Sequence, residues 1–216
     1  YSKALDYFKK SLKLDLSFFG ENHPSVASGY YNIGYVYFAQ GDYSKALEYF
    51  EEVLKIRLSV YGENHSRVAS VYNDIGEIYS VQGDDFKALD YFKKSLKIVL
   101  SVYGENHSQV SSIYDHIGEI YFAQKDYSKA LYYFEESLKI RLSLFGENHP
   151  EVALSYYSIG SLYIIQGDKS KALNYYEKSL KIRLSVYGEN HPLTKEIMDL
   201  INVANSKVLQ SPETTK

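Results

Sequence analysis

Histidine is the first residue type to test for chemistry, because it recurs in this chain at a fixed spacing. Five of the six histidines follow one another every 42 residues, each in a Gly-Glu-Asn-His segment: His23, His65, His107, His149 and His191. Side chains that share a metal ion must converge within a few ångströms. A spacing of 42 residues places them on successive structural units, roughly 10 Å apart if packed helices set the distance. We interpret them as structural loop residues and predict no metal site.

The strongest candidates for acid–base chemistry are four carboxylates, Asp74, Glu77, Asp115 and Glu119. Acid–base catalysis needs a convergent pair in an enclosed pocket, beside a nucleophile or a bound reactant. The spacing of these residues instead places them on an open helical surface. The sequence has no phosphate-binding glycine loop, no Gly-x-Ser-x-Gly and no His-Glu-x-x-His motif. We therefore predict no catalytic residues, no cofactor and no enzymatic activity.

Charge and composition exclude further classes of binding partner. Two lysine columns repeat every 42 residues and would suit a phosphate backbone, but acidic columns offset them, and 24 Lys and Arg stand against 27 Asp and Glu. We expect no nucleic acid as a ligand. Charged or hydroxyl residues interrupt every apolar stretch before the roughly 20 residues that span a bilayer, so no membrane partner is expected. The chain lacks cysteine and a secretion signal, which favours a cytoplasmic location.

The 42-residue period also predicts the fold. A Lys-Ala-Leu segment recurs throughout, with its alanines at Ala4, Ala46, Ala88, Ala130 and Ala172. A fixed period of this length is typical of stacked units that cannot bury their apolar faces alone. Within one unit, Tyr30, Ile33, Gly34 and Tyr37 fall at helical spacing, and so do residues 46, 49, 50 and 53. The sequence thus predicts an all-α protein in which each unit is a pair of antiparallel helices.

The helix ends can be predicted from capping and turn residues. The first-type helix of a unit should begin near Pro24, with Asn22 or His23 as its cap, and end near Gln40. The second-type helix should run from about Tyr43 to Tyr61, and Gly62 should end it in a left-handed conformation. We divide the chain into a half repeat at 1–22, repeats at 23–64, 65–106, 107–148 and 149–190, a capping helix at 191–209 and a disordered tail at 210–216.

The residues at these positions resemble a known family. Tyr30-x2-Ile33-Gly34-x2-Tyr37, followed by Ala46-x3-Phe50, resembles the tetratricopeptide signature and returns in four copies. The 42-residue unit, longer than the usual 34, resembles the repeats of kinesin light chains over residues 1 to 192. The resemblance implies a right-handed superhelical solenoid of stacked helix pairs. It also implies that the chain binds a protein or peptide along a concave groove lined by first-type helices.

The groove residues are those that alternate with the packing positions of the first-type helices. We predict binding contacts at Tyr31, Tyr35, Phe38, Asn73, Asp74, Glu77, Asp115, His116, Glu119, Phe122, Tyr157 and Ser161. This lining has no Lys or Arg, which argues against an acidic peptide ligand. We expect a basic segment with apolar or aromatic anchors. These positions differ between the repeats, and sequence drift on a solvent-exposed face would produce the same differences. His116 suits a binding contact or a solvated position equally well.

Self-association is the alternative function from another class. Residues 1 to 19 form a second-type helix without a first-type partner, which predicts an open apolar face and a chain that is a piece of a longer protein. That edge would stack on the terminal helix of another copy and give an end-to-end dimer or filament. Light scattering over a range of concentrations distinguishes this structural role from a monomeric binding module.

Overall fold

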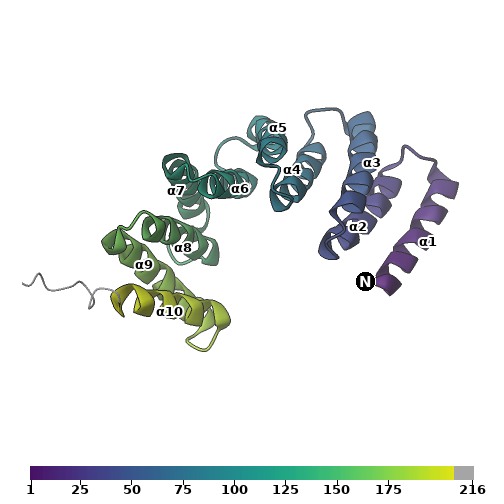
Figure 1. Ribbon diagram of the computed structural model, residues 1–216. Coiled ribbons are helices and arrows are strands. Elements are labelled where there is room, and N and C mark those ends of the chain that lie inside the picture. Colours follow the sequence, from purple (N-terminus) through teal and green to yellow (C-terminus); the bar gives the residue numbers. More distant parts are fainter. Residues whose placement is uncertain (207–216) are drawn as a thin grey trace, which may run out of the picture. The chain divides into compact units, whose positions relative to one another are not determined.

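The computed structural model describes residues 1–206 and consists there of ten α-helices (Figure 1). The predicted all-α class is confirmed. Residues 207–209 of the predicted capping helix and the predicted tail at 210–216 lie outside the described residues. The helices are α1 (Ser2–Phe19), α2 (Pro24–Ala39), α3 (Tyr43–Tyr61), α4 (Ser66–Val81), α5 (Asp85–Tyr103), α6 (Ser108–Ala123), α7 (Tyr127–Phe145), α8 (Pro150–Ile165), α9 (Lys169–Tyr187) and α10 (Pro192–Ser206).

The five periodic histidines cap the first-type helices. His23, rather than Asn22, is the N-cap of α2, and its Nδ1 accepts a hydrogen bond from the backbone N–H of Ser25 at 3.2 Å. Its ring stacks on Phe19 at a centroid distance of 4.3 Å, which ties the loop to the end of α1. The other four histidines form the same N-cap bond at 3.1–3.3 Å. Within residues 1–206 no three His, Cys, Asp or Glu side chains are grouped to hold a metal ion.

The turns on either side of each second-type helix follow the residue types of the repeat. Asp42 caps α3 by accepting a hydrogen bond from the N–H of Lys45, and Gly62 ends the helix. Gly62 has a φ of 78°, as predicted, but a ψ of 171° extends the chain instead of turning it into a left-handed helix. The turn before the second-type helix uses a positive φ as well. Gly41 supplies it before α3, whereas Lys125 adopts a φ of 63° before α7.

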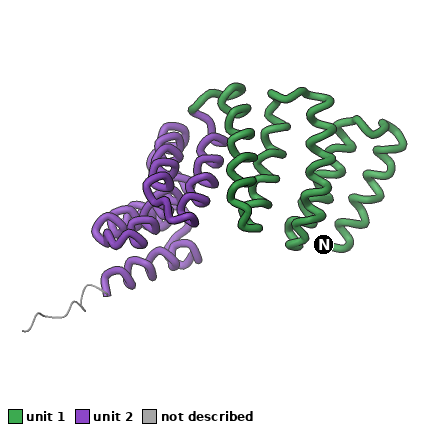
Figure 2. Tube along the Cα trace, turned by 45° about the horizontal axis from the view of Figure 1, so that its top comes forward, with its two compact units in different colours: residues 1–105 green, residues 106–216 purple. Residues whose placement is uncertain are grey.

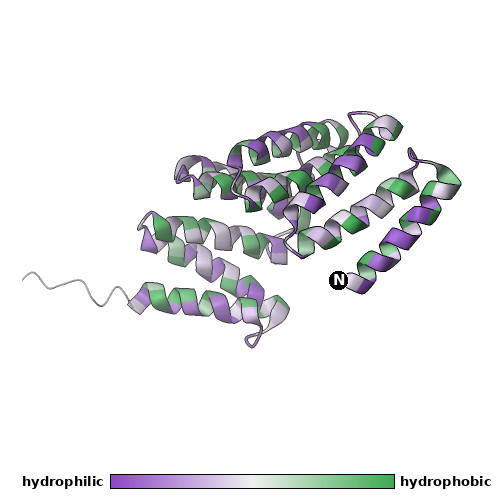
Figure 3. Cartoon of the chain, turned by 45° about the vertical axis from the view of Figure 1, so that its right-hand side comes forward, coloured by the Kyte–Doolittle hydropathy of each residue, from purple (hydrophilic) through white to green (hydrophobic). Residues whose placement is uncertain are grey.

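Close approach of the two helices in a pair explains the small residues of the signature. Ala46 is fully buried, and a Cβ added to Gly34 would lie 3.1 Å from Tyr49 and 3.2 Å from the Phe50 ring. The contact is closer in later pairs, because a Cβ on Gly118 would lie 2.7 Å from Phe134. Glycine is therefore required wherever the large ring of the second-type helix crosses the first-type helix. Figure 3 shows hydrophobic residues alternating with hydrophilic ones along the helices that pack in this way.

The chain divides into two compact units, residues 1–105 and 106–216 (Figure 2). In unit 1, α2 pairs with α3 and α4 with α5, and α1 packs on α2. The described part of unit 2 repeats the arrangement with α6 and α7, then α8 and α9, and adds α10 on α9. In each unit the core is a line of apolar residues between successive helices, with Ile33 and Ile75 in unit 1 and Ile159 in unit 2 almost fully buried.

The first and last helices expose faces of different character. Leu14 of α1 is 60% exposed, whereas Ile56, the residue at the same repeat position, is 3% exposed beneath its first-type partner. The open face of α1 is thus apolar, as the sequence predicts. The exposed surface of α10 is mixed, with polar Lys195, Asn202 and Asn205 beside apolar Leu193 and Val203, while Ile197 is buried on the inner side.

Candidate functional site

The predicted binding residues divide evenly between the two units, and each unit is described by itself. In unit 1, α2 carries Tyr31, Tyr35 and Phe38, and α4 carries Asn73, Asp74 and Glu77. Tyr35 is 57% exposed, and its ring lies 6.5 Å from that of Phe38. Two neighbouring first-type helices therefore present aromatic residues from one side and polar residues from the other.

These two helices enclose a small recess. Its lining consists of Tyr35, Phe38, Phe50, Asp74 and Glu77, and its volume is about 20 Å³. That volume holds one water-sized group, which is also the size of a lysine ammonium. Three aromatic rings and two carboxylates around such a space suit a cation, because rings and carboxylates both attract positive charge.

Asp74 is the most perturbed group in this recess. The Tyr31 hydroxyl donates a hydrogen bond to its carboxylate, while the buried Oδ2 atom has no hydrogen-bond partner. Burial, helped by the negative charge of Glu77, raises the pKa of Asp74 to about 7. The same burial, together with Asp74, raises the pKa of the Tyr31 phenol to about 12. Asp74 therefore titrates near neutral pH and gains from any cation that enters.

Glu77 and Arg57 complete the electrostatics of unit 1. The amide of Asn73 donates to Glu77 Oε1 at 2.6 Å, which holds that carboxylate beside the recess. Arg57 of α3 donates to the carbonyl of Arg67 at 2.7 Å and to the Ser70 hydroxyl at 2.9 Å. Its guanidinium lies 5.3 Å from the centre of the Tyr31 ring and lowers the pKa of Asp74 only through space. The direct contacts of Arg57 thus link α3 to α4.

The buried carboxylate of unit 2, Asp115, has a different environment. Asp115 of α6 forms an ion pair with Arg141 of α7 at 2.6 Å, and the Arg141 side chain is only 4% exposed. Arg141 also pairs with Glu151 at 2.9 Å and donates to the Ser155 hydroxyl at 2.8 Å. Burial raises the pKa of Asp115, and the guanidinium opposes the rise. The predicted lining considered first-type helices alone, and here the second-type helix α7 places a buried arginine, Arg141, beside Asp115.

The remaining predicted residues of unit 2 lie along α6 and α8. His116 Nδ1 is 3.9 Å from Glu119 Oε2, and that Glu119 side chain is 68% exposed. Phe122 packs edge-on against Tyr127, which closes the end of the pair. The Tyr157 hydroxyl donates to Glu196 at 3.1 Å, and the Ser161 hydroxyl lies 3.2 Å from that of Tyr176. Glu119 is the most available carboxylate among these residues.

Sequence reasoning missed the three arginines because it considered first-type helices alone. The repeat position of Arg57 reads Arg, Val, Arg, Arg at residues 57, 99, 141 and 183. The facing position reads Tyr, Asn, Asp, Tyr at residues 31, 73, 115 and 157. Arg183 lies 4.9 Å from the Tyr157 ring centre, so each arginine meets a ring or a carboxylate. A comparison of the residues at these two repeat positions would have indicated which arginine meets which ring or carboxylate.

Known proteins share this architecture. The chain of BtubC (BKLC) from P. vanneervenii has a TM-score of 0.76 at 17% identity, with 100% of this chain and 94% of that chain covered. A putative kinesin light chain from Podospora anserina with nearly identical TPR-like repeats has a TM-score of 0.70 at 17% identity, covering 86% and 88%. The apo form of RapI has a TM-score of 0.72 at 18% identity, covering 85% and 64%. At such identities the likeness concerns the fold.

Comparison of sequences gives a narrower result. No curated protein matches the chain. The tetratricopeptide repeat family matches four overlapping stretches, residues 1–59, 25–101, 67–143 and 109–185. These matches end at residues 59, 101, 143 and 185, which are 42 residues apart, and kinesin light chain-like repeats are among the similar structures. The chain therefore belongs to the tetratricopeptide repeat family, in a 42-residue form similar to the repeats of kinesin light chains.

Proposed function

We propose that this chain is a protein-binding scaffold that holds a segment of another protein along its first-type helices. Unit 1 would supply the position that selects a basic side chain. The observation that carries the proposal is the recess of Tyr35, Phe38, Phe50, Asp74 and Glu77, in which the buried Asp74 Oδ2 has no hydrogen-bond partner. A buried polar atom without a partner costs free energy that a ligand cation would recover.

The ligand that suits this recess is a lysine side chain flanked by apolar residues. Its ammonium matches the size of the recess and offers three donors to two carboxylates. The exposed ring of Tyr35 would cover the aliphatic stem, since long basic side chains pack their stems on apolar surfaces. The charged form of Asp74 binds a cation better than the neutral form, so affinity should rise between pH 6 and pH 8 as Asp74 loses its proton.

Selection from a randomised peptide library tests the proposal without a known partner. Peptides selected on the wild-type chain should be enriched in lysine at one position. The variant Glu77→Lys should bind these peptides about tenfold more weakly or worse in fluorescence anisotropy, because a like-charge contact replaces a desolvated charge pair. Glu119→Lys is the matched control. Because Glu119 is exposed and Arg141 already neutralises Asp115, that variant should have the smaller effect. Selected peptides without lysine, or equal binding by Glu77→Lys, would refute the proposal.

End-to-end self-association has weaker support. The apolar face of α1 favours it, but Asn202 of α10 stands where the paired helices have glycine. A Cβ at that glycine position lies within 2.7–3.2 Å of the facing ring in all four pairs, so α10 of one copy is a poor partner for Phe8 of another. We expect light scattering to report a monomer over a wide concentration range. A mass that grows with concentration would favour the alternative.

A further inference from the structure

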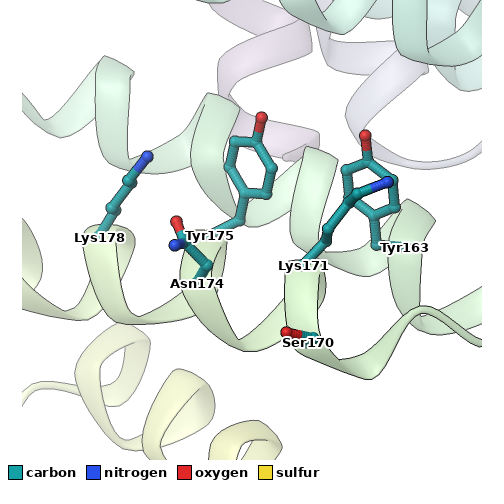
Figure 4. Close-up of a pocket in the computed structure, with 6 residues that line it drawn as sticks. All are labelled: Tyr163, Ser170, Lys171, Asn174, Tyr175 and Lys178. Carbon is teal, nitrogen blue, oxygen red and sulfur yellow. The ribbon is translucent and has the colours of Figure 1, made fainter.

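A second recess lies in unit 2 and is basic where the first is acidic (Figure 4). It is formed by Tyr163 of α8 and by five residues of α9, and its volume is about 330 Å³; the lining is Tyr163, Ser170, Lys171, Asn174, Tyr175 and Lys178. In Figure 4 the ammonium groups of Lys171 and Lys178 and the Tyr175 hydroxyl point to the same side of α9, with Asn174 between the two lysines. None of the residues proposed for peptide binding lines this recess.

The charge of Lys178 is what distinguishes this recess from its counterparts. At the same repeat position Lys94 pairs with Asp90 at 2.7 Å, and Lys10 pairs with Asp6 at 2.8 Å. Both of these carboxylates lie one helical turn earlier, where the α9 sequence has Asn174. Lys178 lies over the rings of Tyr175, at 5.3 Å, and Tyr156, at 5.5 Å, as Lys94 lies over the equivalent rings, but the Asn174 amide cannot neutralise its ammonium.

The side chains that line the recess include two ammonium groups and no carboxylate. Lys171 pairs with Asp168 at 3.2 Å and lies 5.0 Å from the centre of the Tyr163 ring. Burial raises the pKa of Tyr175, and the charge of the Glu135 carboxylate adds to the rise, so Glu135 also acts on the recess. The pair of Lys171 and Asp168 cancels, and the ammonium of Lys178 keeps its charge. With the Asn174 amide one helical turn away, Lys178 therefore offers an anion an uncancelled charge and donors from two side chains.

We propose that this recess binds a single phosphate monoester, presented as a phosphoserine side chain of a partner polypeptide. Lysine ammonium groups bind phosphate as point charges, and a phosphate monoester brings a charge of about −1.5 to −2 at neutral pH with three acceptor oxygens. A nucleic acid is a poorer match, because it needs a row of unpaired cations. The same repeat position reads Lys10, Glu52, Lys94 and Glu136 in the other repeats, so Lys178 has no cationic row around it.

Titration by two-dimensional amide NMR tests the site with defined probes. O-phosphoserine and inorganic phosphate should both shift the resonances of residues 170–178 of the wild-type chain, whereas serine should not. In Asn174→Asp the new carboxylate should pair with Lys178 as Asp90 pairs with Lys94, and the Kd for O-phosphoserine should rise about tenfold. Residue 174 lies on the exposed side of α9, so the fold should be unchanged.

The reciprocal variant in unit 1 is the matched gain-of-function test. Asp90→Asn should release Lys94 beside Tyr79, Lys87 and Tyr91 and create O-phosphoserine-dependent shifts in residues 86–94 that the wild type lacks. Shifts that are equal in wild type and Asn174→Asp would overturn the proposal. Binding of inorganic phosphate without binding of O-phosphoserine would also overturn it, by assigning the recess to the free ion. Neither result bears on the lysine-binding recess of unit 1, which the peptide selection tests separately.

Discussion

Asp74 in unit 1 and Asp115 in unit 2 are both buried carboxylates on first-type helices, yet their surroundings are opposite. Each has one buried oxygen without a hydrogen-bond partner, but the Asp115 carboxylate meets the guanidinium of Arg141 at 2.6 Å, whereas that of Asp74 receives only the Tyr31 hydroxyl. The two positions differ by one residue in the repeat. Asp115 faces the second-type helix of its own pair, and Asp74 faces the preceding first-type helix. One step along the helix thus separates a structural carboxylate from one suited to a ligand.

Removing the arginine from unit 2 should have the largest effect. In Arg141→Met the buried Asp115 loses its counter-charge, and we expect the free energy of unfolding to fall by about 3–5 kcal/mol at pH 7. Arg57→Met removes hydrogen bonds to a carbonyl and a hydroxyl, so it should cost only about 1–2 kcal/mol. Urea denaturation of both variants measures the difference. Equal losses would show that Asp115 and Asp74 do not differ in the way described.

Changing the carboxylates themselves should change stability by different amounts. The pKa of Asp74 is about 7 in the folded protein against an ordinary value of 3.8, so between these values the folded state holds the extra proton. Stability therefore falls as pH rises through this range. Asp74→Asn removes the penalty and should stabilise the protein by about 1–3 kcal/mol at pH 8, with little effect at pH 4.

Asp115→Asn should stabilise the protein less than Asp74→Asn at pH 8, because burial also raises the pKa of Asp115 but the Arg141 ion pair opposes that rise. Thermal denaturation at pH 4 and pH 8 reads out both variants. Destabilisation by Asp74→Asn at pH 8 would mean that the Asp74 carboxylate already has a cationic partner.

The smallest expected effect concerns the turns that begin the second-type helices. Unit 1 uses Gly41 and Gly83 at positive φ, and unit 2 uses Gly167 before α9 but Lys125, with a φ of 63°, before α7. A side chain in this conformation costs about 1–2 kcal/mol relative to glycine. Lys125→Gly should therefore stabilise the chain by about 1 kcal/mol in urea denaturation, and Gly83→Lys should destabilise it by a similar amount. A loss of stability in Lys125→Gly would point to a contact of the lysine side chain that outweighs the strain.

The sequence predicts the helices well because their determinants are local and repeated. The histidine caps and the glycines at the position of Gly62 define helix ends in every repeat, and Gly34 marks a close approach of two helices that the repeat geometry imposes. The Arg141 ion pair was not predicted, since which residues meet across two helices depends on their crossing and rotation. Nor does the period indicate that Asp74 is buried, because its neighbours Tyr31 and Phe38 come from another repeat.

The most direct test of the comparison is the titration of Asp74 by carboxyl ¹³C NMR, with Asp74→Asn used to assign the resonance. We predict a midpoint near pH 7, and a shift to lower pH when a selected lysine peptide is added. A midpoint near 4, close to the ordinary value of an aspartate, would contradict the account, because it would show that the carboxylate is already solvated or paired and that unit 1 offers no unmet charge to a ligand.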